Sequence, residues 1–230
     1  LPDIGAYEHE NAEPVLDTDG PVPTISSTVT SPTNTSTIPI TVTFDETVTD
    51  FEASDVAVSN GGTLTAFTGS GTTYTFSVTP TADGAVTVDI AAEGCMDIFS
   101  NTNVAATQFS IIYDNTGPVA TFSSTIDSIT NVSPVPITIT FNEPVIGFEV
   151  DDITLFDGFN IAEGSFSDFS GSGTSYTVNF TPSTDGWIRL IILEGLCTDD
   201  LGNSNTYSSM GVATLTFDST GPNPLITYWG

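Results

Sequence analysis

Asp114-Asn115-Thr116-Gly117-Pro118-Val119 is the stretch that decides the organisation of the chain, because two relatives of it occur elsewhere. Asp17-Thr18-Asp19-Gly20-Pro21-Val22 lies 97 residues earlier (114 − 17), and Asp218-Ser219-Thr220-Gly221-Pro222-Asn223 lies 104 residues later (218 − 114). Self-similarity at a long period indicates repeated structural units. Each copy contains Gly-Pro, which interrupts regular pairing, and then leads into a new run of residues. We therefore predict that each copy is a linker that opens a domain.

The segments between these linkers repeat as well. Ile38–Glu46 matches Val135–Glu143 at the same offset of 97, whereas Gly69–Thr75 matches Gly171–Thr177 at an offset of 102. Five residues are therefore inserted in the second repeat, near residues 159–163. We predict a tail over residues 1–16, domain 1 over 17–113 and domain 2 over 114–217. Residues 218–230 would hold a linker and the orphan first strand of a further repeat, near 225–228.

Short alternating segments predict the fold class. Apolar residues occupy every second position in residues 38–44, 74–78 and 86–90, and glycine-rich turns separate these runs. Alternation with period two is typical of strands that bury one face, and no segment shows helical periodicity. Many short strands with frequent turns favour a β-sandwich. We therefore predict an all-β protein of two tandem sandwiches.

Charge restricts the possible partners. The chain has 29 acidic residues, one arginine and no lysine, with a net charge of −28. Such a chain cannot neutralise phosphates, so we exclude nucleic acid as a partner, and anionic membrane surfaces would repel it. No stretch approaches the ~20 apolar residues of a membrane-spanning helix, so we predict no membrane insertion. The N-terminus does not resemble a signal peptide, and we interpret the chain as an internal piece of an exported protein.

Several motifs together resemble a known family. They are Asp-x-Thr-Gly-Pro, Pro-Ile-Thr-Val-Thr-Phe-x-Glu at 39–46, Gly-Ser-Gly-x-x-Tyr at 69–74, Thr-Pro-x-x-Asp-Gly at 79–84 and Asp-x-x-Gly-Asn at 199–203. This set resembles the bacterial Ig-like repeats of large surface adhesins, and the resemblance covers both domains. It implies Ig-like sandwiches that serve in extracellular scaffolding and adhesion at the bacterial cell surface. Residues 1–8 resemble the end of a parallel β-helix of bacterial surface proteins.

Acidic residues recur at equivalent positions of the two repeats. In an Ig-like sandwich the first linker, the end of the second strand and the loop before the last strand share one pole. The predicted ligands at these poles are Asp17, Asp19, Asp45, Glu46, Asp97 and Asn101 in domain 1, and Asp114, Glu143, Asp199 and Asn203 in domain 2. Carboxylate and amide oxygens in such numbers suit Ca²⁺. We expect calcium to stiffen the string of domains, as in cadherins; the alternative is a solvated acidic face.

Catalysis is disfavoured by the residues available. The single histidine, His9, lies in the tail, so neither domain has the histidine that a catalytic triad needs. The chain has no lysine to form a Schiff base. Adjacent acidic pairs such as Asp151-Asp152 would point to opposite faces of a strand and cannot act together on a glycosidic bond. Cys95 and Cys197 fall at equivalent places in separate domains, so we expect two buried free thiols. We predict a protein that is not an enzyme.

Domain 2 has large side chains at outward positions where domain 1 has small ones. At an offset of 102, residues 187–193 replace residues 85–91, and the outward positions become large or charged. The predicted partner surface consists of Phe156, Phe159, Ile161, Trp187, Arg189 and Ile191, with Trp187 as its anchor and Arg189 within a strand. Partners would be copies of the same chain, neighbouring domains, or surface glycans and proteins. The predicted function is a calcium-stiffened stalk of a surface adhesin. Its two alternatives are a filament subunit joined by this face or by strand exchange, and a glycan-binding module. The inserted residues could instead cover these side chains within domain 2.

Overall fold

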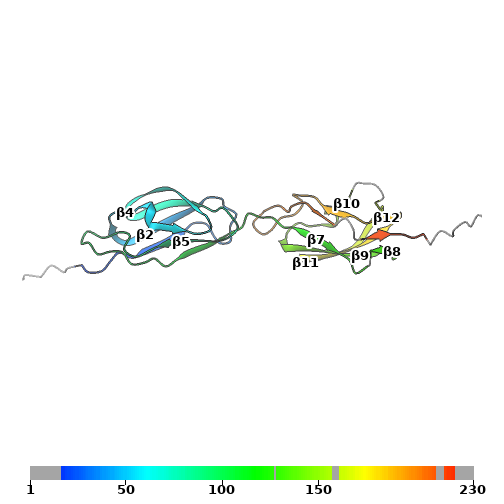
Figure 1. The fold of residues 1–230 in the computed structure, drawn as a ribbon, viewed down its shortest axis with the longest axis horizontal. Coiled ribbons are helices and arrows are strands. Elements are labelled where there is room, and N and C mark those ends of the chain that lie inside the picture. Colours follow the sequence, from blue (N-terminus) through cyan, green and yellow to red (C-terminus); the bar gives the residue numbers. More distant parts are fainter. Residues whose placement is uncertain (1–16, 127, 157–160, 211–214, 221–230) are drawn as a thin grey trace, which may run out of the picture. The chain divides into compact units, whose positions relative to one another are not determined.

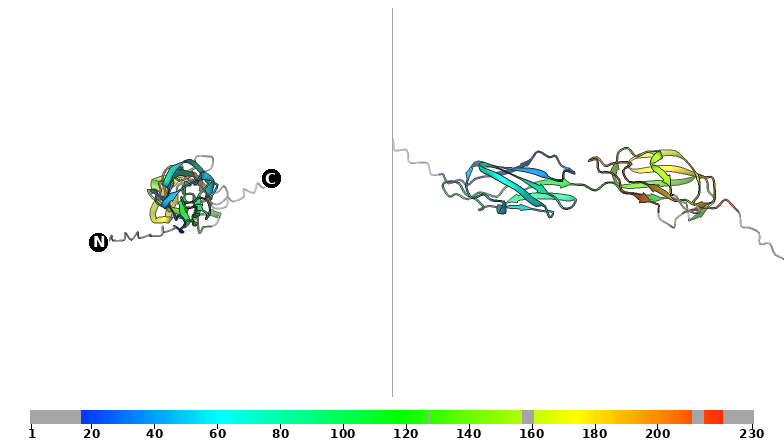
Figure 2. Two further views of the ribbon diagram at one scale, coloured as in Figure 1. Left: turned by 90° about the vertical axis from the view of Figure 1, so that its left-hand side faces the viewer. Right: turned by 90° about the horizontal axis from the view of Figure 1, so that it is seen from above.

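The computed structural model describes residues 17–126, 128–156, 161–210 and 215–220. Figures 1 and 2 show that strands and their connecting loops make up each of the two units, and neither contains an α-helix in these ranges. The two short 3₁₀ turns are too short to cross a membrane. The predicted tail over 1–16 and the predicted strand near 225–228 lie outside the described residues.

Domain 1 consists of two sheets packed face to face. Its elements are β1 (Pro23–Ser27), β2 (Ile38–Val48), η1 (Ala53–Asp55), β3 (Val56–Val58), β4 (Thr63–Thr79), β5 (Gly84–Ile90) and β6 (Phe109–Tyr113). One sheet has the order β1-β2-β4 and the other β3-β5-β6, and every pairing is antiparallel. β2 alternates buried and solvent-facing residues from Ile38 to Phe44, as the sequence pattern predicted.

The long element β4 reverses direction at the predicted Gly69-Ser70-Gly71 turn. Both glycines have positive φ, and a Cβ on Gly69 would overlap the carbonyl oxygen of Thr73. Phe67, before the turn, stacks on Phe76, after it, with 6.1 Å between ring centroids. β4 therefore supplies two strands, and the sandwich has the strand content expected of an Ig-like domain.

Domain 2 repeats this plan. Its elements are β7 (Ala120–Ser123), β8 (Ile129–Thr130), β9 (Val135–Val145), η2 (Val150–Asp152), β10 (Ile153–Leu155), β11 (Gly164–Pro182), β12 (Gly186–Trp187), β13 (Leu190–Ile192), β14 (Ser208–Ser209) and β15 (Thr216–Phe217). The sheets are β7-β9-β11, β10-β13-β14 and β8-β15-β12, the last with a parallel pair between β8 and β15. The two compact units divide between Asp114 and Asn115, one residue after the predicted boundary.

Each domain has its own apolar core built on matching aromatic rings. In domain 1 Phe51 meets Phe44 and Tyr74 edge-on, with centroid separations of 5.1 and 5.0 Å. In domain 2 the same arrangement joins Phe148 to its two partners, Phe141 and Tyr176. Edge-to-face packing of this kind stabilises a core beyond simple burial. The two cysteines are buried and free, as predicted, and burial raises the pKa of each thiol to about 11.

Candidate metal centre

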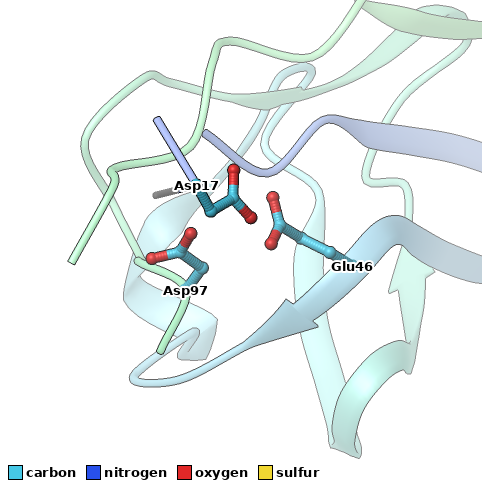
Figure 3. Close-up of side chains that lie close together, drawn as sticks. All are labelled: Asp17, Glu46 and Asp97. Carbon is cyan, nitrogen blue, oxygen red and sulfur yellow. The ribbon is translucent and has the colours of Figure 1, made fainter. Parts of the chain in front are cut away.

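Three carboxylates of domain 1 meet at the pole where the chain enters the sandwich. Asp17 precedes β1, Glu46 lies near the end of β2, and Asp97 lies in the loop between β5 and β6. Each offers an oxygen atom, and these atoms lie within 4.8 Å of one another. Figure 3 shows the three side chains pointing toward one another from three separate segments. We call this group the domain 1 triad.

The loop that contains Asp97 is folded around its own carboxylate. The side chain of Asp97 is 3% exposed, and its Oδ1 accepts hydrogen bonds from the backbone N–H groups of Phe99 and Asn101, each at 2.8 Å. The Asn101 side-chain nitrogen donates to Asp97 Oδ2 at 2.8 Å and to the Asp17 carbonyl oxygen at 3.1 Å. Asn101 thereby links the loop to the linker, and its nitrogen positions two members of the triad.

The glycine of the linker motif lets the linker lie against this loop. A Cβ on Gly20 would overlap the carbonyl oxygen of Thr102, and a Cβ on Gly117 would overlap that of Ser204 in domain 2. Only glycine permits so close an approach of two backbones. The Asp-x-x-Gly-Pro motif therefore sets the distance between the linker aspartate and the loop.

Besides Asn101, two predicted ligands of domain 1 lie outside the triad, Asp45 and Asp19. Asp45 precedes Glu46 on β2, so its side chain points to the opposite side, where Oδ1 accepts a hydrogen bond from Val22 N at 2.8 Å. Asn142 does the same for Val119 N in domain 2, at 2.7 Å. Asp19 is exposed, and its backbone N–H donates to Asp17 Oδ1 at 3.1 Å. The structure thus gives Asp45 a role in joining β1 to β2.

Domain 2 repeats the triad. Asp114, Glu143 and Asp199 bring carboxylate oxygens within 4.8 Å of one another. Asp199 is 5% exposed and accepts hydrogen bonds from the backbone of Leu201 and from the backbone and side chain of Asn203, each at 2.8 Å. The two sites therefore use the same three segments and the same supporting asparagine.

A second pair of asparagines, Asn103 and Asn205, lies behind the loops and was not among the predicted site residues. Asn103 is 2% exposed, and its Oδ1 accepts hydrogen bonds from Gly94 N and Cys95 N while its Nδ2 donates to the carbonyl oxygens of Ala91 and Val104. Asn205 makes the matching contacts in domain 2. Both asparagines recur at the offset of 102, and this recurrence was the signal that could have identified them.

The predicted partner surface of domain 2 is brought together in part. Trp187 is 44% exposed and lies beside Ile161 through a parallel bridge, and Ala162 N donates to the Trp187 carbonyl oxygen at 2.8 Å. The Arg189 guanidinium carbon lies 4.1 Å from the centroid of the Phe156 ring. Ile191 is half-buried on β13, and Phe159 lies outside the described residues.

The prediction that Arg189 lies within a strand is wrong. Ile188 and Arg189 separate β12 from β13, because the chain changes pairing partner between them. β12 pairs with β15, whereas β13 pairs with β10 and β14. The prediction that Trp187 points outward is nevertheless correct, since Trp187 is exposed and its neighbour Ile188 is buried.

Comparison with protein families identifies the repeats. The family described as bacterial Ig-like domain matches residues 17–113 and again residues 114–215, which together are most of the chain. The chain belongs to the bacterial Ig-like domain family. The family resemblance expected from the linker and strand motifs is thus confirmed, and so is the all-β fold of two tandem Ig-like domains.

Solved structures similar to this tandem of Ig-like domains include bacterial and mammalian proteins. The D00-D0 domain of intimin has a TM-score of 0.39 and 13% identity over 86% of this chain and 100% of its own. Mouse nectin-like molecule 4 gives 0.40 and 10% over 89% of this chain and 67% of its own. Invasin, a bacterial integrin-binding protein, gives 0.38 and 16%, and the match spans 83% of this chain and 39% of the invasin chain. No curated protein matches the chain.

The carboxylates of the first Ig-like domain differ in their affinity for protons. Burial raises the pKa of Glu46 above its usual 4.5, and the charges of Asp17, Asp97, Asp45 and Asp19 raise it further. Burial also opposes ionisation of Asp97, but hydrogen bonds from Asn101 and from the loop backbone hold its pKa below the usual 3.8. Residues 17–113 include no lysine, arginine or histidine, so no basic side chain of the domain neutralises the triad.

If the domain 1 triad binds calcium, its affinity is expected to weaken as the pH falls toward the raised pKa of Glu46. Because the pKa of Glu46 is raised, this carboxylate takes up a proton at a higher pH than a free glutamate does, and the ion would then have to displace that proton. Asp97 stays ionised to lower pH. Isothermal titration calorimetry from neutral pH to 4.5, in two buffers of different ionisation heat, measures the proton release. Constant affinity down to pH 4.5 would contradict this assignment, and Glu46→Gln should lack the effect.

The ion-free protein should respond to pH in the opposite sense. A raised pKa means that the folded domain binds the Glu46 proton more tightly than the unfolded chain does, so its stability increases as the pH falls through that pKa. The stability contributed by Asp97 is present above its unfolded pKa and is lost as the pH falls through its lowered folded pKa. A cation held by the triad would therefore compete with a proton for Glu46 as the pH falls through the raised pKa of this group.

Proposed function

We propose that the chain is a non-enzymatic module of a bacterial cell-surface adhesin, in which calcium stiffens a stalk of Ig-like domains. The recurrence of the triad supports this proposal. In both domains one carboxylate comes from the linker, through Asp17 or Asp114, and the other two come from the sandwich that follows. A cation held by all three would fix the linker to the domain that it enters. The extracellular location agrees with the charge of −28, which needs salt or bound cations for compensation.

The donor set fits calcium. Three carboxylates can supply up to six of the six to eight oxygen ligands that Ca²⁺ takes, and backbone carbonyls or water can complete the shell. Thiols and imidazoles, which zinc prefers, are absent from the described residues of both triads. Asp97 and Asp199 are held in preformed loops by hydrogen bonds from the loop backbone, so the ion needs to recruit only the linker aspartate and the glutamate. Binding would therefore act mainly on the linker.

The link between the two domains gives a direct test. Asp114 immediately follows β6, whose last residue is Tyr113, so fixing Asp114 to Glu143 and Asp199 would leave no free residue after that strand. We expect ¹⁵N relaxation to show slower, coupled tumbling of the domains with calcium and independent tumbling with chelator. Glu143→Gln should abolish the coupling, whereas Glu46→Gln, the matched change in domain 1, should retain it. Tumbling that does not depend on calcium would refute the stiffening role.

A second candidate function, a subunit that assembles with copies of itself, is favoured by the exposure of Trp187. Trp187→Ser with Ile191→Thr is expected to weaken any self-association at least tenfold, measured by analytical ultracentrifugation, because a large aromatic anchor is lost. Tyr207→Ser is the matched control, since Tyr207 is 48% exposed and Trp187 is 44% exposed. A fall in Tm in place of a fall in association would mean that these side chains pack within domain 2.

A further inference from the structure

Domain 1 has a groove between its two edge strands. β1 pairs only with β2, and β6 pairs within its sheet only with β5, so each leaves one edge unpaired by a neighbouring strand. The two edges are joined at one end by a hydrogen bond from Val104 N to the Pro21 carbonyl oxygen, at 3.0 Å. At the other end, Thr33 N donates to the Ile112 carbonyl oxygen at 2.9 Å. Between these ties lies a cavity of about 420 Å³ whose walls are residues 22–25, Ala105 and residues 107–110.

Backbone groups on the β1 side of this groove are available to a ligand. The Val22 carbonyl oxygen accepts a hydrogen bond from Asp45 N, so the backbone groups of Val22 point toward β2. In an antiparallel ladder alternate residues direct their N–H and C=O groups to opposite sides. Pro23 and Ile25 therefore direct their backbone groups away from β2, toward the groove. Pro23 has no N–H, so this wall offers two carbonyl oxygens and the Ile25 N–H.

The β6 wall offers the complementary groups. Ile112 uses its N–H and C=O for the tie to residues 31–33, so these groups face away from β5. Ser110 lies two residues before Ile112 in the same strand, so its N–H and C=O groups also face away from β5. Thr87, the residue opposite Ser110 in the ladder, agrees with this, because its backbone groups point to Ser59 on the other side. The Thr87 carbonyl oxygen accepts a hydrogen bond from Ser59 N at 3.0 Å, and the Thr87 N–H donates to Ser59 Oγ at 2.8 Å. Ser110 N–H and C=O thus face the groove, where no hydrogen bond joins residues 22–27 to residues 105–110 among the described contacts.

Charge distinguishes the groove from the rest of the surface. All nine residues of its walls are uncharged, on a chain with 29 acidic residues. Ile25 and Phe109 pack against the core and are only partly buried, so they offer an apolar floor. A second hollow of about 500 Å³ shares Ala105 with it, and its lining includes Asp55 and Asp89. The Asp89 carboxylate also accepts hydrogen bonds from Gln108 Nε2, at 2.8 and 3.0 Å. The site therefore offers an uncharged channel that leads to two negative charges.

Domain 2 shows how the same gap is tied. There Ala120 N donates to Ser208 Oγ at 3.0 Å, which joins β7 to β14 across the gap. The equivalent residues of domain 1 are Pro23 (120 − 97) and Ala106 (208 − 102). Proline has no N–H to donate and alanine has no hydroxyl to accept, so this hydrogen bond cannot form in domain 1. The open groove of domain 1 is therefore a property of its sequence.

We propose that the groove of domain 1 binds an extended, uncharged peptide segment of another protein, which adds as a strand between β1 and β6 and places an adjoining basic residue at Asp55 and Asp89. Strand addition uses main-chain hydrogen bonds for affinity, here to Ile25 on one side and Ser110 on the other. The neutral walls exclude an acidic segment, because its carboxylates would be desolvated without a partner. The two carboxylates beyond Ala105 select lysine or arginine. This partner binding extends the adhesin role and does not depend on calcium.

Amide exchange on the full chain tests the proposal. The probe is an acetylated peptide of alternating threonine and valine preceded by one lysine, together with a twin that is N-methylated at alternate residues. At about 1 mM peptide, exchange at the Ile25 and Ser110 amides is expected to slow at least tenfold, and the methylated twin should give no protection. Equal binding of both peptides would show attraction by charge alone and would overturn the proposal, as would no binding at this concentration.

The chain offers matched variants for the same experiment. Pro23→Ala with Ala106→Ser installs the hydrogen bond of domain 2 and is expected to weaken peptide binding at least tenfold. Ala106→Ser alone leaves Pro23 without a donor, so it should leave the affinity within about twofold. Asp89→Asn should weaken binding of the lysine peptide but not of a lysine-free peptide. If the double variant binds as tightly as the wild type, or if protection appears away from β1 and β6, the groove is not the site.

Discussion

Calcium is expected to raise the Tm of the chelated protein by about 10–20 °C at a free concentration near a hundred times the Kd. A ligand that binds only the folded state at that concentration stabilises it by about 2.7 kcal/mol. For a domain of 97 residues (17–113), each kcal/mol shifts Tm by about 4–8 °C. The effect should be large because the ion replaces mutual repulsion of three carboxylates with attraction. Differential scanning calorimetry with and without chelator measures it.

Glu46→Gln separates ion binding from general screening of charge. Ionised Glu46 is disfavoured in the ion-free fold, so the variant should be at least as stable as the wild type in chelator, yet its domain 1 transition should no longer respond to calcium. Glu143→Gln should do the same for domain 2. Sodium chloride at equal ionic strength is the control, because screening acts on all exposed carboxylates. A calcium response that sodium reproduces, or that survives both substitutions, would refute the metal sites.

The repeat made most of the architecture predictable from sequence. Alternation in residues 38–44 predicted which side of β2 is buried, and two offsets located the linkers. The triads followed from the same reasoning, because three separated segments of an Ig-like sandwich return to one pole. Alternation could also have shown that only one of Asp45 and Glu46 can join the triad, since neighbouring side chains of a strand point to opposite sides. The structure shows that Glu46 belongs to the triad and that Asp45 accepts a hydrogen bond from Val22 N on the other side of the strand.

Other features depend on contacts between segments that no local pattern contains. The break at Ile188 and Arg189 arises where a strand exchanges one partner for another, and a run of apolar residues reads the same with or without that exchange. The groove between β1 and β6 arises from what Pro23 and Ala106 lack. Absent donors and acceptors become informative only when the partner position is known, which here requires the hydrogen bond of Ala120 with Ser208.

Asn103→Leu is expected to destabilise domain 1 by about 3–5 kcal/mol, a large part of the stability of a small domain. The side chain of Asn103 satisfies two backbone donors and two backbone acceptors, at 2.8–2.9 Å, in a site that is 2% exposed. Leucine fits the volume but removes all four hydrogen bonds, three of them partly buried, and leaves the Cys95 N–H buried without a partner, which by itself costs about 1–3 kcal/mol. Relaxation of the loop limits the total. Urea unfolding followed by calorimetry of the two transitions measures the loss.

The same substitution should also weaken calcium binding, because Asn103 fixes the segment between Gly94 and Val104 that presents Asp97. Asn205→Leu is the matched change, and it should shift only the domain 2 transition. Thr102→Ala, at an exposed position of the same loop, should change stability by less than about 0.5 kcal/mol. If Asn103→Leu were as mild as Thr102→Ala, water would have to replace the lost partners, and the loop would owe its shape to Asp97 and Asn101 alone. If a destabilised Asn103→Leu variant kept its calcium affinity, the geometry of the triad would not depend on Asn103.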